Sequence, residues 1–378
     1  MASAEVAAPI QVGAEEKTND ASGGSELLNA TVKESQSTQK SQEIKNEELS
    51  GPRKTPFRRP TEGSHPDARA TLTAEQAEKY EMLLATAKSW TDIADSSANG
   101  TKSTITDSER MWLSKDCLLR YLRASKWAVT TAASRLQATL TWRREWGLEQ
   151  HTADYISEEN ATGKQVVIGF DKQGRPCLYL NPHRQNTKGK EKQMHHLVFM
   201  LERCIDLMPP GQEGLALLVN FSHTRQGQGA SPAQGIQTIQ ILQNHYPERL
   251  GISIVQEVPW YIKMFFKIIN PFIDPVTREK LKFDWDLKLL IPSEQLLKEF
   301  GGDVDFEYEH DQYWPAFNGM ANEYKAQMVA NWEAGGKKVG ESEMYLKGGE
   351  EQAQPDKAEE AVANGEAKTL EKENASVK

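Results

Sequence analysis

Residues 215–221 have the sequence Leu-Ala-Leu-Leu-Val-Asn-Phe, an apolar run that lies between Gly214 and Ser222. A strand without alternating polar residues is typical of a sheet that is covered on both faces, as parallel sheets are. The run therefore predicts a buried strand near the centre of a parallel sheet.

The segments around this run alternate between strand and helix patterns. Residues 165–170 (QVVIGF) and 175–180 (RPCLYL) are two short β-rich runs separated by a turn at 171–174, which predicts a hairpin. Apolar periodicity predicts helices over 191–207, around 236–242, over 260–269 and over 292–300, and further strands over 252–255 and 281–283. Strands that alternate with helices indicate an α/β fold with a mainly parallel sheet.

Helical patterns dominate the sequence before this lobe. Thr73-Ala-Glu-Gln76 has the capping-box pattern, one helix is expected from Thr106 through Trp127, and another from 130 to Gly147, with a loop over 93–105. The two ends of the chain lack apolar periodicity. We expect four regions: a disordered arm, 1–70; a helical domain, 71–150; an α/β lobe, 151–320; and a C-terminal extension, 321–378, acidic and disordered from about residue 340.

The composition excludes several classes of protein. A net charge of −9 argues against nucleic-acid binding. The three cysteines form no C-x-x-C pair, so neither a disulfide framework nor a zinc site is expected. The apolar segment 260–269 is too short to span a bilayer, and no secretory signal is apparent. We expect a soluble protein whose membrane contact is peripheral; the basic cluster within 53–59 is either a solvated linker or a weak membrane contact.

Sequence motifs of the common enzyme classes are missing. The chain has no G-x-S-x-G elbow, no phosphate-binding P-loop and no dinucleotide-binding glycine pattern. His195 and His196 are adjacent and point in different directions on a helix, and Ser222-His223 has no acidic partner placed by pattern. We therefore expect no catalytic residue, no metal and no cofactor.

Two features suit binding instead. Segment 260–269 (WYIKMFFKII) is apolar around most of a helix, which fits either a plain core helix or a helix that closes over a ligand. Tyr246-Pro-Glu-Arg249 and the segment 274–280 (DPVTREK) each precede a predicted strand. Their polar side chains suit either a polyol or phosphate ligand, or local ion pairs at helix ends.

Six segments, in this order, resemble the CRAL-TRIO superfamily over residues 75–320: LLRYLRASKWAV, GRPCLYLNP, LLVNF, HYPERLG, NPFIDPVTREKL and FGG. They are most similar to its fungal phosphatidylinositol-transfer branch. NPHRQNT and LERCIDLMPPGQ resemble the subgroup linked to sterol homeostasis and azole tolerance. The resemblance implies a helical N-terminal bundle beside an α/β lobe, whose sheet forms the floor of an apolar pocket that a mobile helix gates.

The resemblance also implies a site. In phosphatidylinositol-binding members, the residues that hold the inositol-phosphate headgroup match Glu248, Thr277, Lys280 and Lys126. The gate matches residues 260–271, and its apolar side chains are Trp260, Phe265, Phe266 and Ile269. The expected ligand is phosphatidylinositol, exchanged between membranes by a cytoplasmic protein that is peripheral at intracellular membranes such as the endoplasmic reticulum, lipid droplets or the cell periphery.

The chain departs from the family pattern at two places. Ser125 stands where an Arg often precedes the family's Lys, which puts one phosphate contact in doubt. Leu215 and Leu217 stand at pocket-wall positions where phosphatidylcholine-binding members carry hydroxyls, so we expect poor phosphatidylcholine binding. The alternatives are a carrier of sterol or another apolar ligand, a lipid-modifying enzyme, and a scaffold that recruits partners through its acidic tail.

Overall fold

The computed structural model describes residues 51–350 and 353, except 99, 226–227 and 229. The expectations for residues 1–50 and for the end of the acidic tail lie outside the described residues. Order begins earlier than the predicted boundary at residue 70. The Arg53 N–H donates to the Asp305 carbonyl at 2.6 Å, and the Glu307 N–H donates to the Arg53 carbonyl at 3.0 Å. Backbone pairing thus attaches the described part of the N-terminal arm to the folded protein.

The helical N-terminal domain contains four helices and a small hairpin. The capping box at Thr73 is confirmed and begins the first of them. These elements are α2 (Ala74–Lys88), β1 (Asp92–Ala94), β2 (Lys102–Thr104), α3 (Asp107–Trp112), α4 (Lys115–Ala124) and α5 (Val129–Trp146). Gly147 ends α5 in the left-handed conformation, as its position in the sequence predicted.

Two predictions in this domain were wrong. The expected loop over 93–105 contains the antiparallel hairpin β1–β2, whose strands are three residues long and mostly exposed. The single helix expected from Thr106 is two helices, because Ser114 begins α4 as a new N-cap. Its hydroxyl accepts a hydrogen bond from the Cys117 N–H at 3.0 Å.

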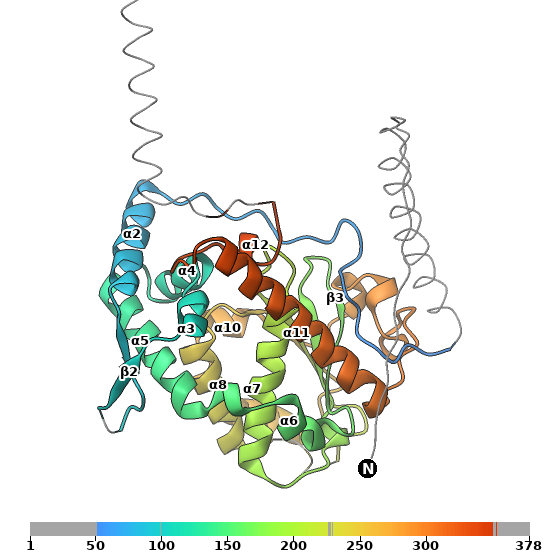
Figure 1. The fold of residues 1–378 in the computed structure, drawn as a ribbon. Coiled ribbons are helices and arrows are strands. Elements are labelled where there is room, and N and C mark those ends of the chain that lie inside the picture. Colours follow the sequence, from blue (N-terminus) through green and yellow to red (C-terminus); the bar gives the residue numbers. More distant parts are fainter. Residues whose placement is uncertain (1–50, 99, 226–227, 229, 351–352, 354–378) are drawn as a thin grey trace, which may run out of the picture. The chain divides into compact units, whose positions relative to one another are not determined.

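A five-stranded sheet forms the centre of the α/β lobe (Figure 1). Its strands are β3 (Gln165–Phe170), β4 (Pro176–Leu180), β5 (Leu215–Asn220), β6 (Leu250–Gln256) and β7 (Leu281–Phe283), in that spatial order. The β3–β4 pair is antiparallel, as the predicted hairpin requires, and the other three pairs are parallel. The predicted α/β class with a mainly parallel sheet is confirmed, with the 215–221 run at its centre.

Helices connect and cover these strands. The α-helices are α6 (Ala153–Asn160), α7 (Lys190–Asp206), α8 (Pro232–His245), α9 (Trp260–Ile269) and α10 (Pro275–Glu279). Short 3₁₀ turns are η1 (Leu148–Gln150), η2 (Pro182–Arg184), η3 (Asn270–Phe272), η4 (Leu287–Leu289), η5 (Ser293–Gln295) and η6 (Lys298–Phe300). The helix expected over 292–300 is therefore two separate turns, η5 and η6. Among the described residues, no helix has both the length and the apolarity that crossing a membrane requires.

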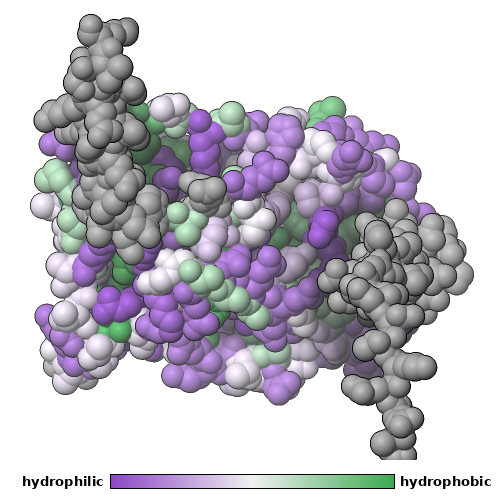
Figure 2. Space-filling view, turned by 45° about the horizontal axis from the view of Figure 1, so that its top comes forward, coloured by the Kyte–Doolittle hydropathy of each residue, from purple (hydrophilic) through white to green (hydrophobic). Residues whose placement is uncertain are grey.

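The C-terminal extension is ordered further than the sequence suggested. Helix α11 (His310–Ala334) crosses α7 (Figure 1), and α12 (Glu343–Leu346) follows, so structure continues past residue 340. The buried Tyr313 hydroxyl of α11 bonds both the N–H and the carbonyl of Val167 in β3. The face of the protein that is drawn in Figure 2 is largely hydrophilic, with separate hydrophobic patches.

Candidate functional site

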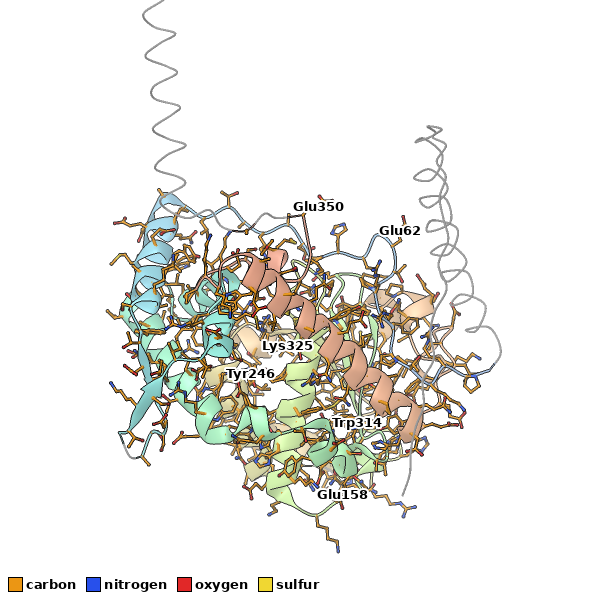
Figure 3. All side chains as sticks on the ribbon, viewed as in Figure 1. Glu62, Glu158, Tyr246, Trp314, Lys325 and Glu350 are labelled. Atoms are coloured by element: carbon orange, nitrogen blue, oxygen red, sulfur yellow. The ribbon has the colours of Figure 1, made fainter. Side chains whose placement is uncertain are left out.

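The turn between α8 and β6 presents Glu248 at the surface. Tyr246, Pro247 and Arg249 around it are buried. Glu248 itself has φ +61°, a left-handed conformation that costs a non-glycine residue about 1–2 kcal/mol. The turn is anchored by the Tyr246 hydroxyl, which donates to Glu202 Oε1 at 2.6 Å (Tyr246 is labelled in Figure 3). Backbone strain at an exposed carboxylate between buried neighbours is typical of a functional position.

The Glu248 carboxylate is paired with an arginine of α4. Arg123 donates from Nε to Glu248 Oε2 at 2.5 Å, and from Nη2 to Glu213 Oε2 at 3.0 Å. The sequence analysis did not identify Arg123 as part of the site, although it stands in the same LRASK segment as the predicted Lys126. Any ligand that bonds Glu248 must share or displace Arg123.

Lys280 lies within electrostatic reach of this pair. Its Nζ donates to the Leu250 carbonyl at 2.7 Å. Burial lowers the pKa of Lys280; the nearby Glu248 opposes this shift and Arg123 adds to it. A partly buried ammonium without a directly bonded carboxylate suits a phosphodiester ligand, whose charge would compensate its desolvation.

Thr277 lies on the short helix α10, just before Lys280. Its N–H donates to the Asp274 carboxylate at 2.9 Å, and Thr277 is half-buried. Gln243 of α8 donates to Asp274 Oδ2 at 3.0 Å, which ties α10 to the helix before the Glu248 turn. These contacts fix Thr277 in α10, where its carbonyl accepts a hydrogen bond from the Lys280 N–H at 3.2 Å.

Lys126, the fourth predicted headgroup residue, stands apart in this structure. It is exposed at φ +50°, in the turn that ends α4, and its side chain makes no hydrogen bond or ion pair with a described residue. The neighbouring Ser125 is buried, and its hydroxyl accepts from Arg135 Nη1 at 3.4 Å. No contact therefore brings Lys126 or Ser125 to Glu248 and Lys280.

Strand register identifies the sheet face that α9 covers. Leu217 and Val219 of β5 pair in register with Ser253 and Val255 of β6, so the four side chains share one face. Val219 and Val255 cluster with side chains of α9, among them Ile262. Leu217 is half-buried on this face and Leu215 is buried, and Ser253 supplies a buried hydroxyl that the sequence analysis did not consider.

The predicted gate residues divide between two sides of α9. Phe266 packs edge-on against Phe283 of β7 with ring centroids 5.1 Å apart, and Ile269 is buried. Phe265 approaches α8 so closely that a Cβ on Gly235 would lie 2.6 Å from its ring. Trp260 instead is 70% exposed and points away from the sheet. The helix is thus closed over the sheet, with Trp260 on its outer side.

The outer side of α9 is an exposed apolar stripe. Trp260, Met264 and Ile268 follow one another at four-residue spacing and are all exposed. Lys263 and Lys267, also exposed, accompany them. Phe272 and Val276 continue the exposed apolar residues beyond α9. Apolar side chains beside lysines suit contact with an anionic membrane surface.

A polar cavity of about 880 Å³ lies elsewhere, beside the ion pair of Arg143 and Glu202. Neither Leu217 nor any residue of α9 lines it. Ser222 and His223 were considered above as a possible catalytic pair. In the described part of the chain they form no hydrogen bond with each other, and the Ser222 N–H donates to Asn220 Oδ1 at 2.9 Å. The groups that the geometry brings together are therefore those of the Glu248 turn, Lys280 and the covered sheet face.

Comparison with known proteins gives this arrangement a family. The mixed sheet, the helical N-terminal domain and the helix-covered apolar face define an α/β protein with a helical N-terminal domain. The CRAL/TRIO domain model matches residues 160–302, and the CRAL/TRIO N-terminal domain model matches residues 79–138. The chain belongs to the CRAL/TRIO family.

Its relatives include fungal proteins. A CRAL-TRIO domain-containing protein of Schizosaccharomyces pombe is 49% identical over 74% of this chain, which spans only 28% of that protein. The phosphatidylinositol transfer protein PDR17 of Saccharomyces cerevisiae is 37% identical over 66% of this chain and 76% of its own length. The SEC14 cytosolic factor of Candida glabrata is 27% identical over 50% of this chain and 71% of its own length. The resemblance to the fungal phosphatidylinositol-transfer branch is confirmed.

Proposed function

We propose that this chain binds one phosphatidylinositol molecule and exchanges it between membranes. The observation that carries the proposal is the placement of the Lys280 ammonium on the Leu250 carbonyl, two residues after Glu248, which itself pairs with Arg123. The similarity to PDR17, over three quarters of that protein's length, supports the same ligand. Because no catalytic group is required for exchange, the proposed activity is non-enzymatic.

In the proposed headgroup site, Lys280 and Glu248 bind different parts of the ligand. Lys280 neutralises the phosphodiester, while the Glu248 carboxylate accepts hydrogen bonds from inositol hydroxyls and the Thr277 hydroxyl accepts from them or donates to them. Arg123 leaves Glu248 as the hydroxyls arrive and remains paired with Glu213. Lys126, exposed at the end of α4, is proposed to reach the phosphate only when ligand is present.

The proposed acyl-chain site is the sheet face under α9. Its wall carries Leu217, Val219 and Val255, and lipid entry requires α9 to move away from them. Contact of Trp260 and Met264 with a membrane would favour that movement, because it removes their apolar surface from water. We propose that the protein acts in the cytoplasm and contacts membranes peripherally.

The apolar wall also favours a second candidate, a sterol or another apolar ligand. Leu215 and Leu217 offer no hydrogen bonds to a phosphocholine headgroup, so poor phosphatidylcholine binding remains our expectation. Ser253 carries a hydroxyl on the same face. A hydrogen bond from this hydroxyl to a phosphocholine headgroup would weaken that expectation. Sterol binding would not depend on Lys280, which separates the two candidates.

Transfer of labelled phosphatidylinositol between vesicles tests the proposal. Lys280→Ala should lose at least about tenfold in transfer, the cost of one charge-assisted hydrogen bond. Lys282→Ala is the matched control, since Lys282 is an exposed lysine in β7, two residues further along the chain. Equal transfer by Lys280→Ala and wild-type protein would reject the headgroup site.

A further inference from the structure

Helix α12 carries a carboxylate into the protein interior. Glu343 Oε1 accepts from Arg120 Nη2 at 2.6 Å and from the Ser114 hydroxyl at 2.8 Å. The Glu343 N–H donates to Asp116 Oδ2 at 2.7 Å, and Arg249 Nη2 approaches Oε1 at 3.4 Å. The C-terminal extension thereby contacts both the start of α4 and the arginine that follows Glu248.

The same extension is anchored a second time by Lys347. Its buried ammonium donates to the carbonyls of Ile205 and Met208, both at 2.9 Å, at the C-terminal end of α7. Burial lowers the pKa of Lys347 to about 8, and Glu343 opposes the shift. Both ends of α12 are therefore held by charged groups that have left water.

A continuous series of ion pairs connects Glu343 to Glu248. Arg120 Nη1 donates to Glu213 Oε1 at 3.0 Å. Arg123 then bridges Glu213 Oε2, at 3.0 Å, and Glu248 Oε2, at 2.5 Å. With Arg249, the network contains three arginines and three glutamates, so its formal charges balance.

Removing the Glu343 charge would unbalance this network. Arg120 has a side chain only 4% exposed, and a buried charge that loses its partner draws the nearest remaining counter-charge. For Arg120 and Arg249 that group is Glu213, whose carboxylate and carbonyl they already contact. Arg123 would then lose its share of Glu213 and pair with Glu248 alone.

We propose that Glu343 is a positioning residue for the headgroup site: by neutralising Arg120 and Arg249, it leaves Glu213 available to Arg123, so that Glu248 can exchange Arg123 for ligand hydroxyls. This inference rests on the proposed function. Glu343 lies outside the two matched CRAL/TRIO domains, so the proposal gives the C-terminal extension a part in ligand binding. The ordered tail past residue 340 acquires a role through Glu343 that composition alone did not suggest.

The test uses phosphatidylinositol in vesicles with the full-length chain. Glu343→Gln should weaken phosphatidylinositol binding about tenfold, because Glu248 becomes more tightly paired with Arg123. Glu323→Gln is the control, since it breaks another ion pair of the C-terminal extension, with Arg58, that does not connect to Glu248. Unchanged binding by Glu343→Gln would overturn the inference.

A double variant tests the positioning role directly. E343Q/R120Q removes Glu343 together with the arginine that would otherwise take over the Glu213 carboxylate. It leaves two arginines and two glutamates in the network, and should bind phosphatidylinositol within about threefold of wild type. If Glu343→Gln does not fold, this comparison alone decides, and a tenfold loss in the double variant contradicts the inference. Absence of phosphatidylinositol binding by the wild-type chain would instead reject the proposed function.

Discussion

Arg123 and Glu248 are joined at 2.5 Å across the boundary between the helical domain and the α/β lobe. Arg123 therefore holds the carboxylate that we propose for the inositol ring. Because Arg123 has a second partner in Glu213, it can release Glu248 without becoming unpaired. The contact that closes the proposed headgroup site can thus be exchanged for ligand hydroxyls.

Glu248→Gln tests the assignment of this carboxylate. The amide cannot accept as strongly from inositol hydroxyls, so phosphatidylinositol affinity should fall about tenfold to a hundredfold. The fold should be retained, because the Glu248 side chain lies at the surface and Arg123 keeps Glu213. Binding is measured by titration with phosphatidylinositol vesicles. Glu279→Gln, an exposed glutamate on α10, is the control, and equal affinity of the two variants would exclude Glu248 from the site.

The outer stripe of α9 should bind membranes through its apolar side chains. Met264 and Met82 are exposed to nearly the same extent, 51% and 53%, but Met82 lies on α2. Met264→Ser should reduce binding to anionic vesicles severalfold, since only the exposed half of Met264 is left to bury and this half contributes about half of the 1.5–3 kcal/mol of a fully buried methionine. Met82→Ser should leave vesicle co-sedimentation unchanged. Equal losses would show that α9 is not the membrane-contacting element.

Packing of α9 against α8 should control its release. In Gly235→Ala the new methyl would lie 2.6 Å from the Phe265 ring, so the ring must move. Overpacking of this kind lowers the free energy of unfolding by about 1–3 kcal/mol, and the higher helix propensity of alanine offsets about 1 kcal/mol of this loss. We expect faster lipid exchange with slightly lower stability. Gly319→Ala in α11 meets no atom within 4 Å and should only stabilise. Slower or unchanged exchange in Gly235→Ala would contradict this account of the gate.

Stability should fall as pH drops below 6.5 because of His245. Its ring stacks on Trp142 with centroids 4.1 Å apart, and Thr139 Oγ1 lies 3.1 Å from Nδ1. Burial, together with the charges of Arg135 and Arg143, lowers the pKa of His245 to about 4. The unfolded chain therefore binds the proton first. After a discount for the partial exposure of the ring, about 2 kcal/mol of stability is lost between pH 6.5 and 4.

Denaturant unfolding across this pH range provides the measurement. His245→Phe keeps the stacking area and removes the titration, so its stability should change less between pH 6.5 and 4 than that of the wild type. His65→Phe, at an exposed histidine of the arm, should retain the wild-type slope. A slope unaffected by His245→Phe would assign the acid sensitivity to other groups.

Much of the fold could be predicted because local signals and burial agree. The bounds of β3 and of α9 coincide with their apolar segments, and the Thr73 capping box starts α2 as its residues require. The break at Ser114 was missed because apolar periodicity continues across it. Strands β1 and β2 were missed because they are three residues long and mostly exposed, without a buried face to produce a pattern.

The site was harder to predict than the fold. Glu248, Thr277 and Lys280 stand in motifs, and the family resemblance identified them. Arg123, which pairs with Glu248, and Glu343, which pairs with Arg120, are placed by tertiary contacts between segments more than a hundred residues apart, which no local pattern records. Composition near residue 340 is acidic and polar, and the segment is ordered by ion pairs with buried arginines and by the packing of Val339 and Leu346.

The central claim is that Lys280 helps to hold a phosphatidylinositol headgroup, and mass spectrometry of lipids that co-purify with the protein tests it most directly. Wild-type protein and the Lys282→Ala control should carry phosphatidylinositol, and Lys280→Ala should carry little or none. Sterol alone, or equal amounts of phosphatidylinositol in all three proteins, would contradict the claim.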